Sequence, residues 1–92
     1  MSNPDAYNLK PGHVVMYSAS WCPDCKRARA FFIEHNIEFL DIDLGKDIDG
    51  YLFVEGLTRR VRVPTIIFPD AAILIEPSNE ALAQQLGVKN NA

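Results

Sequence analysis

The segment that decides the fold is HVVMYSASWCPDCKRARAFF, residues 13–32. It begins with a short apolar run at residues 13–17 that lacks strict alternation, which is typical of a central strand covered on both faces. Pro23 then suits the first turn of a helix, where its missing N–H has no cost. From Pro23 to about His35, apolar side chains recur at three- and four-residue steps and predict a helix with one buried stripe. The stripe consists of Ala28, Phe31, Phe32 and His35.

The rest of the chain continues the alternation of strands and helices. Residues 38–44 predict a half-buried strand near a sheet edge, with Leu40, Ile42 and Leu44 on one face. Residues 47–57 predict a helix with Ile48 and Leu52, together with Val54 and Leu57, turned inward. Residues 1–12 are expected to be a loose lead-in and residues 89–92 a frayed tail.

The C-terminal third predicts a hairpin and a last helix. Residues 63–68 and 72–75 form two strands, and the short link between them indicates an antiparallel pair. A helix is expected from Ser78 to Leu86, with Gly87 as its end. The order is β-α-β-α-β-β-α. The fold class is therefore α/β, with a four-stranded mixed sheet and helices on both faces.

Length and composition limit the classes of protein to which the chain can belong. Its 92 residues, 48% of them hydrophobic, indicate one domain over residues 1–92 with a core at about 13–87. The net charge of −3 argues against disorder and against a general nucleic-acid binder. An apolar run of about 18 residues is missing, so no membrane span is expected. The first residues lack signal-peptide features, so a cytoplasmic location is expected. The protein is also expected to be a monomer.

The two cysteines are the strongest chemical signal. Cys22 falls at the predicted helix N-terminus, where free N–H groups and the helix dipole stabilise an anion. Cys25 follows one turn later on the same face, within about 5–6 Å, so a disulfide between the two is geometrically possible. A thiolate at the first position and a more buried resolving thiol at the second would suit dithiol exchange. Asp24 places a carboxylate beside Cys22, which opposes a second negative charge there.

Three alternatives remain for this pair: a structural disulfide, a zinc site or two inert thiols. A disulfide across so short a segment removes little unfolded-state entropy. Zinc needs four ligands, and His13 and His35 would have to supply the other two at a spacing that fits no finger pattern. Separately, Val63-Pro64 on its own predicts a trans proline that opens an edge strand.

In these motifs taken together, the chain resembles members of the thioredoxin superfamily and, within it, of the glutaredoxin family. The resemblance covers about residues 13–87. It is carried by Cys22-Pro23-Asp24-Cys25, by Val63-Pro64-Thr65 and by Pro77-Ser78-Asn79-Glu80. The chain is too short for the extra strand and helix of thioredoxins, and Met16 stands where they keep a buried Asp. The resemblance therefore implies the minimal glutaredoxin form of the thioredoxin fold.

Within that family the chain is most similar to mycoredoxins, which work with mycothiol. The similarity lies in Ser20-Trp21-Cys22, in Val63-Pro64-Thr65 and in the turn at Glu76-Pro77-Ser78. Two features differ from glutathione-type glutaredoxins. Asp24 replaces their tyrosine, and Glu76-Pro77 replaces their two glycines.

The resemblance implies a thiol–disulfide oxidoreductase in which Cys22 attacks and Cys25 resolves. Pro64 would be cis, the Val63 backbone would pair with the substrate, and Arg60 or Arg62 would lie near its carboxylate. Ser78 and Asn79 would meet the polar groups of a small thiol. The remaining substrate-binding residues would be Trp21, Pro23 and Asp24.

The implied co-substrate is mycothiol or glutathione, with no bound cofactor or metal. NADPH would supply electrons indirectly through a flavin disulfide reductase, and disulfide-containing proteins would be the partners. The alternative is a non-catalytic thioredoxin-fold module for protein docking or iron–sulfur assembly, and the presence of Cys25 counts against it.

The distribution of charge predicts an electropositive active-site side or, alternatively, two solvated faces. Six basic residues fall in two segments that the fold would bring near Cys22: Lys26, Arg27, Arg29, Arg59, Arg60 and Arg62. Four acidic residues fall in a segment expected to run toward the opposite edge: Asp41, Asp43, Asp47 and Asp49. An electropositive site would favour an anionic thiol or an acidic partner.

Overall fold

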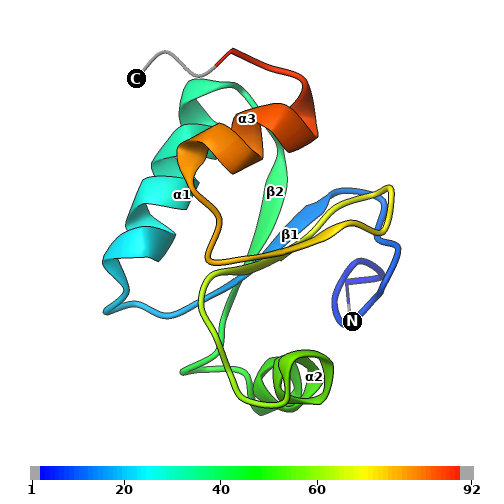
Figure 1. Cartoon of the computed structure of the whole chain (residues 1–92). Coiled ribbons are helices and arrows are strands. Elements are labelled where there is room, and N and C mark those ends of the chain that lie inside the picture. The colour runs from blue at the N-terminus through cyan, green and yellow to red at the C-terminus, as the bar shows by residue number, and fades with distance from the viewer. Residues whose placement is uncertain (1–2, 90–92) are drawn as a thin grey trace.

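A four-stranded mixed sheet runs through the centre of the computed structural model, which describes residues 3–89 (Figure 1). The strands are β1 (Val14–Ser18), β2 (Phe39–Asp43), β3 (Thr65–Ile67) and β4 (Ile73–Ile75), in the order β2-β1-β3-β4. β1 is parallel to β2 and antiparallel to β3, and β3 and β4 form the antiparallel hairpin. The predicted α/β class, element order and mixed sheet are therefore confirmed, as is the edge position of β2.

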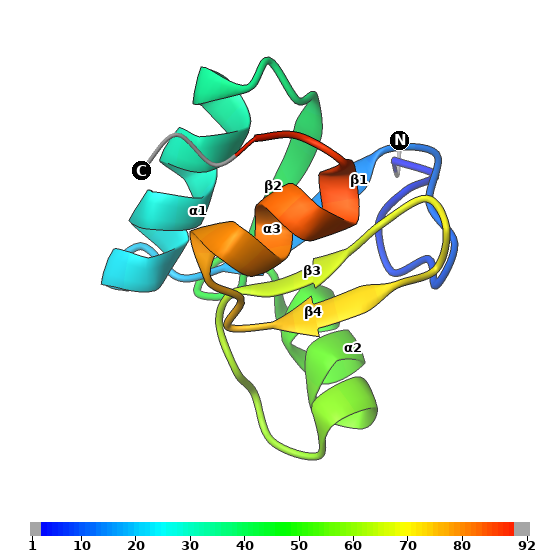
Figure 2. The same ribbon diagram turned by 45° about the horizontal axis from the view of Figure 1, so that its top comes forward.

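Helices cover both faces of this sheet. They are α1 (Pro23–Glu34), α2 (Ile48–Thr58) and α3 (Asn79–Leu86). Figure 2 shows α1 and α3 together on one side and α2 on the other. Alternating β1 residues explain the division, because Val14 and Met16 pack toward α1 and α3 while Val15 and Tyr17 pack toward α2. All five β1 residues are buried, as its unbroken apolar run indicated.

The helix α2 packs through a face that only partly matches the one predicted. Ile48 and Leu52 were expected to point inward, but they are 67% and 55% exposed. Val54 is buried and Leu57 partly buried, as predicted, and Gly50 is buried although it was not predicted to be. A Cβ atom on Gly50 would come within 3.1 Å of the side chains of Ile42 on β2 and Leu44 just after it. The bare backbone of Gly50 therefore lets α2 approach the sheet closely, and this close approach turns Ile48 and Leu52 outward.

The N-terminal segment is also better fixed than a loose lead-in. The backbone N–H of Tyr7 donates to the buried Tyr17 hydroxyl at 2.9 Å, and the Tyr7 ring packs edge-on against Phe53. The Gly12 N–H donates to the Asp5 carboxylate at 2.7 Å. These contacts attach residues 3–12 to the α2 side of the sheet. Most of the predicted frayed tail, residues 90–92, lies outside the described residues. Between residues 3 and 89, the helices are all too short or too polar to cross a membrane.

Candidate active site

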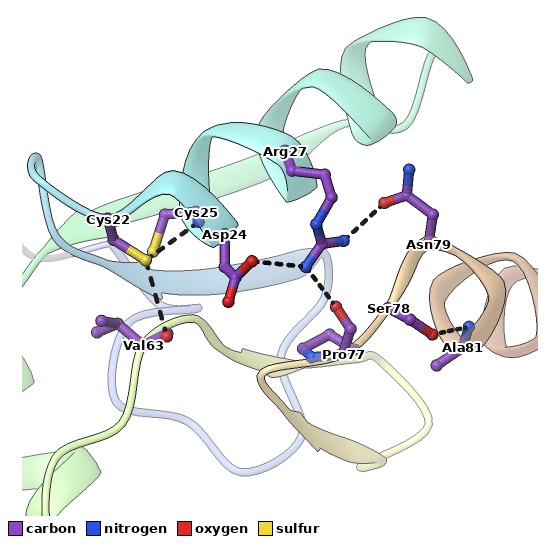
Figure 3. Close-up of polar contacts among 9 residues, drawn as sticks. All are labelled: Cys22, Asp24, Cys25, Arg27, Val63, Pro77, Ser78, Asn79 and Ala81. Atoms are coloured by element: carbon purple, nitrogen blue, oxygen red, sulfur yellow. Dashed lines mark hydrogen bonds and ion pairs between the residues drawn. The ribbon is translucent and has the colours of Figure 1, made fainter. Parts of the chain in front are cut away.

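The two cysteines lie where β1 passes into α1. Cys22 is the N-cap of α1, and its Sγ accepts the backbone N–H of Cys25 at 3.2 Å (Figure 3). Pro23 occupies the first helical turn, as predicted. The Cys22 thiol also points toward the backbone carbonyl of Val63, with 3.8 Å between sulfur and oxygen. Cys22 therefore lies between a helix N-terminus that stabilises an anion and the loop before β3.

Cys25 is the more buried thiol of the pair. It has no exposed surface, whereas Cys22 retains 4%, and both are free thiols. Burial raises the pKa of Cys25 above its ordinary value, and its contact with the Cys22 sulfur raises it further. The Cys25 thiol is therefore protonated near neutral pH, which separates it chemically from a group that must attack as a thiolate.

The Val63–Pro64 peptide bond is cis. The sequence pattern alone predicted a trans bond, so that prediction is wrong, and the expectation drawn from the family resemblance is confirmed. Pro64 itself is buried, directly before the start of β3. The Val63 carbonyl, immediately before it, is the oxygen that faces Cys22 Sγ.

A groove of about 540 Å³ opens beside Cys22, and we call it the thiol groove. Its lining residues are Trp21, Cys22, Pro23, Asp24, Arg60, Val61, Arg62, Val63 and Glu76. Seven of the predicted site residues, Cys22 among them, thus come together in one groove. Val61 and Glu76 were not predicted to line the site. The signal for Glu76 was present, because it replaces a family glycine, but no pattern marked Val61.

Ser78 and Asn79 do not line this groove. The Ser78 hydroxyl accepts the backbone N–H of Ala81 at 3.1 Å and caps α3, as predicted. The Asn79 side-chain oxygen accepts from Arg27 at 2.7 Å, and the same guanidinium donates to the Pro77 carbonyl at 2.9 Å (Figure 3). Arg27 therefore bridges α1 to the N-terminus of α3, a role that the sequence did not reveal.

The predicted separation of charges is only partly present. Arg60 and Arg62 line the thiol groove, and Arg62 lies 3.9 Å from the Glu76 carboxylate. Arg29 instead pairs at 2.8 Å with Asp41, one of the acids expected to be remote. The reason is that parallel β2 lies next to β1, so α1 crosses back over the acidic face of β2. One basic residue of α1, Arg29, is therefore neutralised by an acid that was expected to lie far from the site.

The two histidines lie apart from the cysteines. The His13 ring contacts the Asp5 carboxylate at 2.9 Å, and this hydrogen bond raises its pKa above the ordinary value of 6.5. The His35 ring packs on Phe31 with 4.3 Å between ring centres. Among residues 3–89 there is no group of three or more His, Cys, Asp or Glu side chains that could hold a metal ion. The zinc alternative thus finds no ligand set in this part of the chain.

Comparison with known proteins assigns the family. The family model described as Glutaredoxin matches residues 14–73, well over half of the chain. A glutaredoxin-like protein of Clostridium pasteurianum, described as an uncharacterized 8.6 kDa protein in a rubredoxin operon, is 28% identical over 53 residues, which are 58% of this chain and 71% of that protein. The glutaredoxin structure from Archaeoglobus fulgidus is 23% identical, with a TM-score of 0.72 over 85% of this chain and 90% of that one. A Methanosarcina mazei Go1 glutaredoxin structure is 21% identical, with a TM-score of 0.71 over 83% and 79%. The chain belongs to the glutaredoxin family.

Proposed function

We propose that this glutaredoxin-family chain is a thiol–disulfide oxidoreductase in which Cys22 is the nucleophile and Cys25 the resolving thiol. The observation that carries the proposal is the difference between the two sulfurs. Cys22 caps α1 and lines the thiol groove, whereas Cys25 is completely buried one turn later. A sulfur that borders a groove at a helix N-terminus, and a protonated, fully buried sulfur behind it, suit two successive steps of disulfide exchange.

In the first step the Cys22 thiolate attacks one sulfur of a substrate disulfide. A new S–S bond forms to Cys22, the substrate bond breaks, and the leaving thiolate takes the electron pair and then a proton. In the second step Cys25 loses its proton and attacks Cys22 Sγ. This releases the remaining substrate thiol and leaves an intramolecular Cys22–Cys25 disulfide. Two electrons from a reductant then return this disulfide to the dithiol. Alternatively, an external thiolate attacks the substrate sulfur of the mixed disulfide, which breaks its bond to Cys22 and releases Cys22 as a thiolate.

The groove residues support the binding part of the proposal. The Val63 backbone, held before cis Pro64, faces the reacting sulfur and would pair with the substrate backbone. Arg60 and Arg62 would attract a carboxylate, although Glu76 beside Arg62 weakens that attraction. Trp21, Pro23 and Asp24 would form the opposite wall.

Ser78 and Asn79 would contribute from the start of α3, at the far end of a small thiol. Their acceptor oxygens already bind Ala81 and Arg27. The Asn79 amide NH₂ is therefore the group that would donate to the polar part of the thiol.

The co-substrate we propose is a low-molecular-weight thiol, mycothiol or glutathione, used in the cytoplasm by a monomer. The mycoredoxin-like features at Ser20-Trp21-Cys22 and Glu76-Pro77-Ser78 favour mycothiol. Pro77 offers no backbone N–H, and Glu76 adds a negative charge next to it, so both disfavour a glutathione carboxylate there. NADPH would supply electrons through a flavin disulfide reductase, and disulfide-containing proteins would be the physiological partners.

A coupled assay of NADPH oxidation tests the proposal. Wild type, Cys22→Ser and Cys25→Ser would be compared with a small disulfide substrate in three arms: mycothiol with its reductase, glutathione with its reductase, and thioredoxin reductase. Wild type should turn over in at least one arm, and Cys22→Ser should be inactive in all of them. Equal rates for wild type and Cys22→Ser would rule out the enzyme and favour a non-catalytic binding module.

A further inference from the structure

A second hollow lies directly beside the thiol groove, and we call it the apolar pocket. It encloses about 210 Å³, and its lining residues are Ala19, Trp21, Leu44, Gly45, Tyr51, Val61 and Val63. Three of these, Trp21, Val61 and Val63, also line the thiol groove. The two hollows therefore share a wall, and the apolar pocket extends the site from Cys22 toward α2.

The apolar pocket and the thiol groove differ in chemistry. All seven residues around the apolar pocket are uncharged, whereas Asp24, Arg60, Arg62 and Glu76 line the groove. Binding sites for whole small ligands usually measure about 300–1,000 Å³. The apolar pocket is smaller than that range, so its volume suits a single side chain better than a complete cofactor or thiol.

Aromatic side chains stand exposed at the rim of this pocket. Trp21 is 77% exposed and Tyr51 39% exposed, although both are large and apolar. Ile48 and Leu52 are also exposed on α2, but neither lines the pocket. Single exposed apolar residues are ordinary, but two exposed aromatic side chains that line one pocket mark a contact surface.

We infer that the apolar pocket is a side-chain subsite for polypeptide disulfides, and that it takes a large aliphatic or aromatic residue within two positions of the substrate cysteine. The inference rests on the proposed function and adds to it a class of substrate. Its basis is the shared wall: an extended peptide advances about 3.3–3.6 Å per residue, so a peptide whose sulfur meets Cys22 carries its neighbouring side chains across Trp21 and Val63. Burial of such a side chain against apolar walls favours the complex.

The test follows a single step with defined probes. Short glycine peptides with a central cysteine would carry thionitrobenzoate as a mixed disulfide, with one leucine at each of the four flanking positions in turn. The Cys22 thiolate attacks the peptide sulfur, the bond to thionitrobenzoate breaks, and the coloured thiolate leaves with the electron pair. Pre-reduced protein in excess gives the second-order rate constant. Division by the rate of the same peptide with dithiothreitol removes differences in intrinsic reactivity.

At least one leucine peptide should react about tenfold faster than the all-glycine peptide with wild type. Tyr51→Ser should reduce that ratio toward one, because Tyr51 forms part of the pocket wall. Ile48→Ser is the matched control, since Ile48 is a more exposed apolar residue of the same helix that does not line the pocket. It should retain the wild-type ratio.

Three results would overturn the inference while leaving the oxidoreductase intact. The first is equal normalised rates for all peptides. The second is an equal loss in Ile48→Ser, which would place the contact along the exposed face of α2. The third is concentration-dependent dimerisation that Tyr51→Ser abolishes, which would show that a second copy of the chain covers the pocket. A failure of every probe, including the all-glycine peptide, would instead contradict the proposed function itself.

Discussion

Arg27 is expected to hold α3 against α1, and its replacement by methionine tests this role. One guanidinium nitrogen donates to Asn79 at 2.7 Å and the other to the Pro77 carbonyl at 2.9 Å, and the side chain is 34% exposed. Methionine keeps an unbranched apolar stem and a similar helix propensity but removes both donors. Arg27→Met therefore isolates the two hydrogen bonds that join the helices.

The expected cost can be worked out from these contacts. A hydrogen bond with one charged partner contributes about 1.5–3 kcal/mol. Both acceptors here are uncharged and can turn to water in a partly open site, so we expect about 2 kcal/mol for the two bonds together. Asp24 adds little, because it lies 3.5 Å from Arg27 and is 57% exposed. With a denaturant slope of about 1–2 kcal/mol/M, the urea midpoint of Arg27→Met should fall by about 1–2 M.

A double-mutant cycle separates this bridge from a general loss of packing. Urea unfolding would be measured for wild type, Arg27→Met, Asn79→Ala and the double variant, with Asp24→Asn as the control for the exposed ion pair. The Arg27–Asn79 coupling energy should be about 1 kcal/mol. A coupling energy near zero, or an Arg27→Met stability within about 0.5 kcal/mol of wild type, would refute the bridge.

Three further outcomes are expected. The rate of the resolving step, measured as peptide release from a Cys22 mixed disulfide, should increase with pH, because burial raises the pKa of Cys25. The release should be absent in Cys25→Ala, and a rate that does not depend on pH would contradict this expectation. Tyr17→Phe should cost about 1 kcal/mol and speed hydrogen exchange of the Tyr7 amide, which loses its acceptor. The thermal midpoint of His13→Gln should be lower than that of wild type near pH 5 and equal to it near pH 8. The reason is that the raised pKa of His13 stabilises the fold below about pH 6.5, and this stabilisation is lost as the pH rises through the pKa of the folded state.

Local chemistry explains why much of the fold and most of the groove residues could be predicted from the sequence. The unbroken apolar run at residues 13–17 marks a strand covered on both faces, and Pro23 after Cys22 marks a helix start. Each signal depends on residues within a few positions of one another. The cysteine pair is equally local, because one helical turn fixes the relation of Cys22 to Cys25 whatever the rest of the chain does.

The features that were missed depend on contacts between distant segments. Arg27 and Arg29 are two residues apart and look equivalent, yet one bonds at the start of α3 and the other meets Asp41 on β2. Hydrophobic periodicity likewise favoured Ile48 and Leu52 as the inner face of α2. It could not register Gly50, whose contribution is the absence of a side chain where the helix backbone approaches the sheet.

The two sides of the reactive sulfur therefore offer a substrate different kinds of contact. Toward α3, the acceptor oxygens of Asn79 and Ser78 are already bound by Arg27 and by the Ala81 N–H, which leaves the Asn79 amide NH₂ to donate to a small thiol. Toward α2, Trp21 and Tyr51 remain exposed around an uncharged pocket. The free energy gained from apolar burial increases with the length of the substrate, whereas the contribution of a few partly paired charges does not. This difference between the two sides is the ground on which we infer an apolar subsite for polypeptide disulfides beside Cys22.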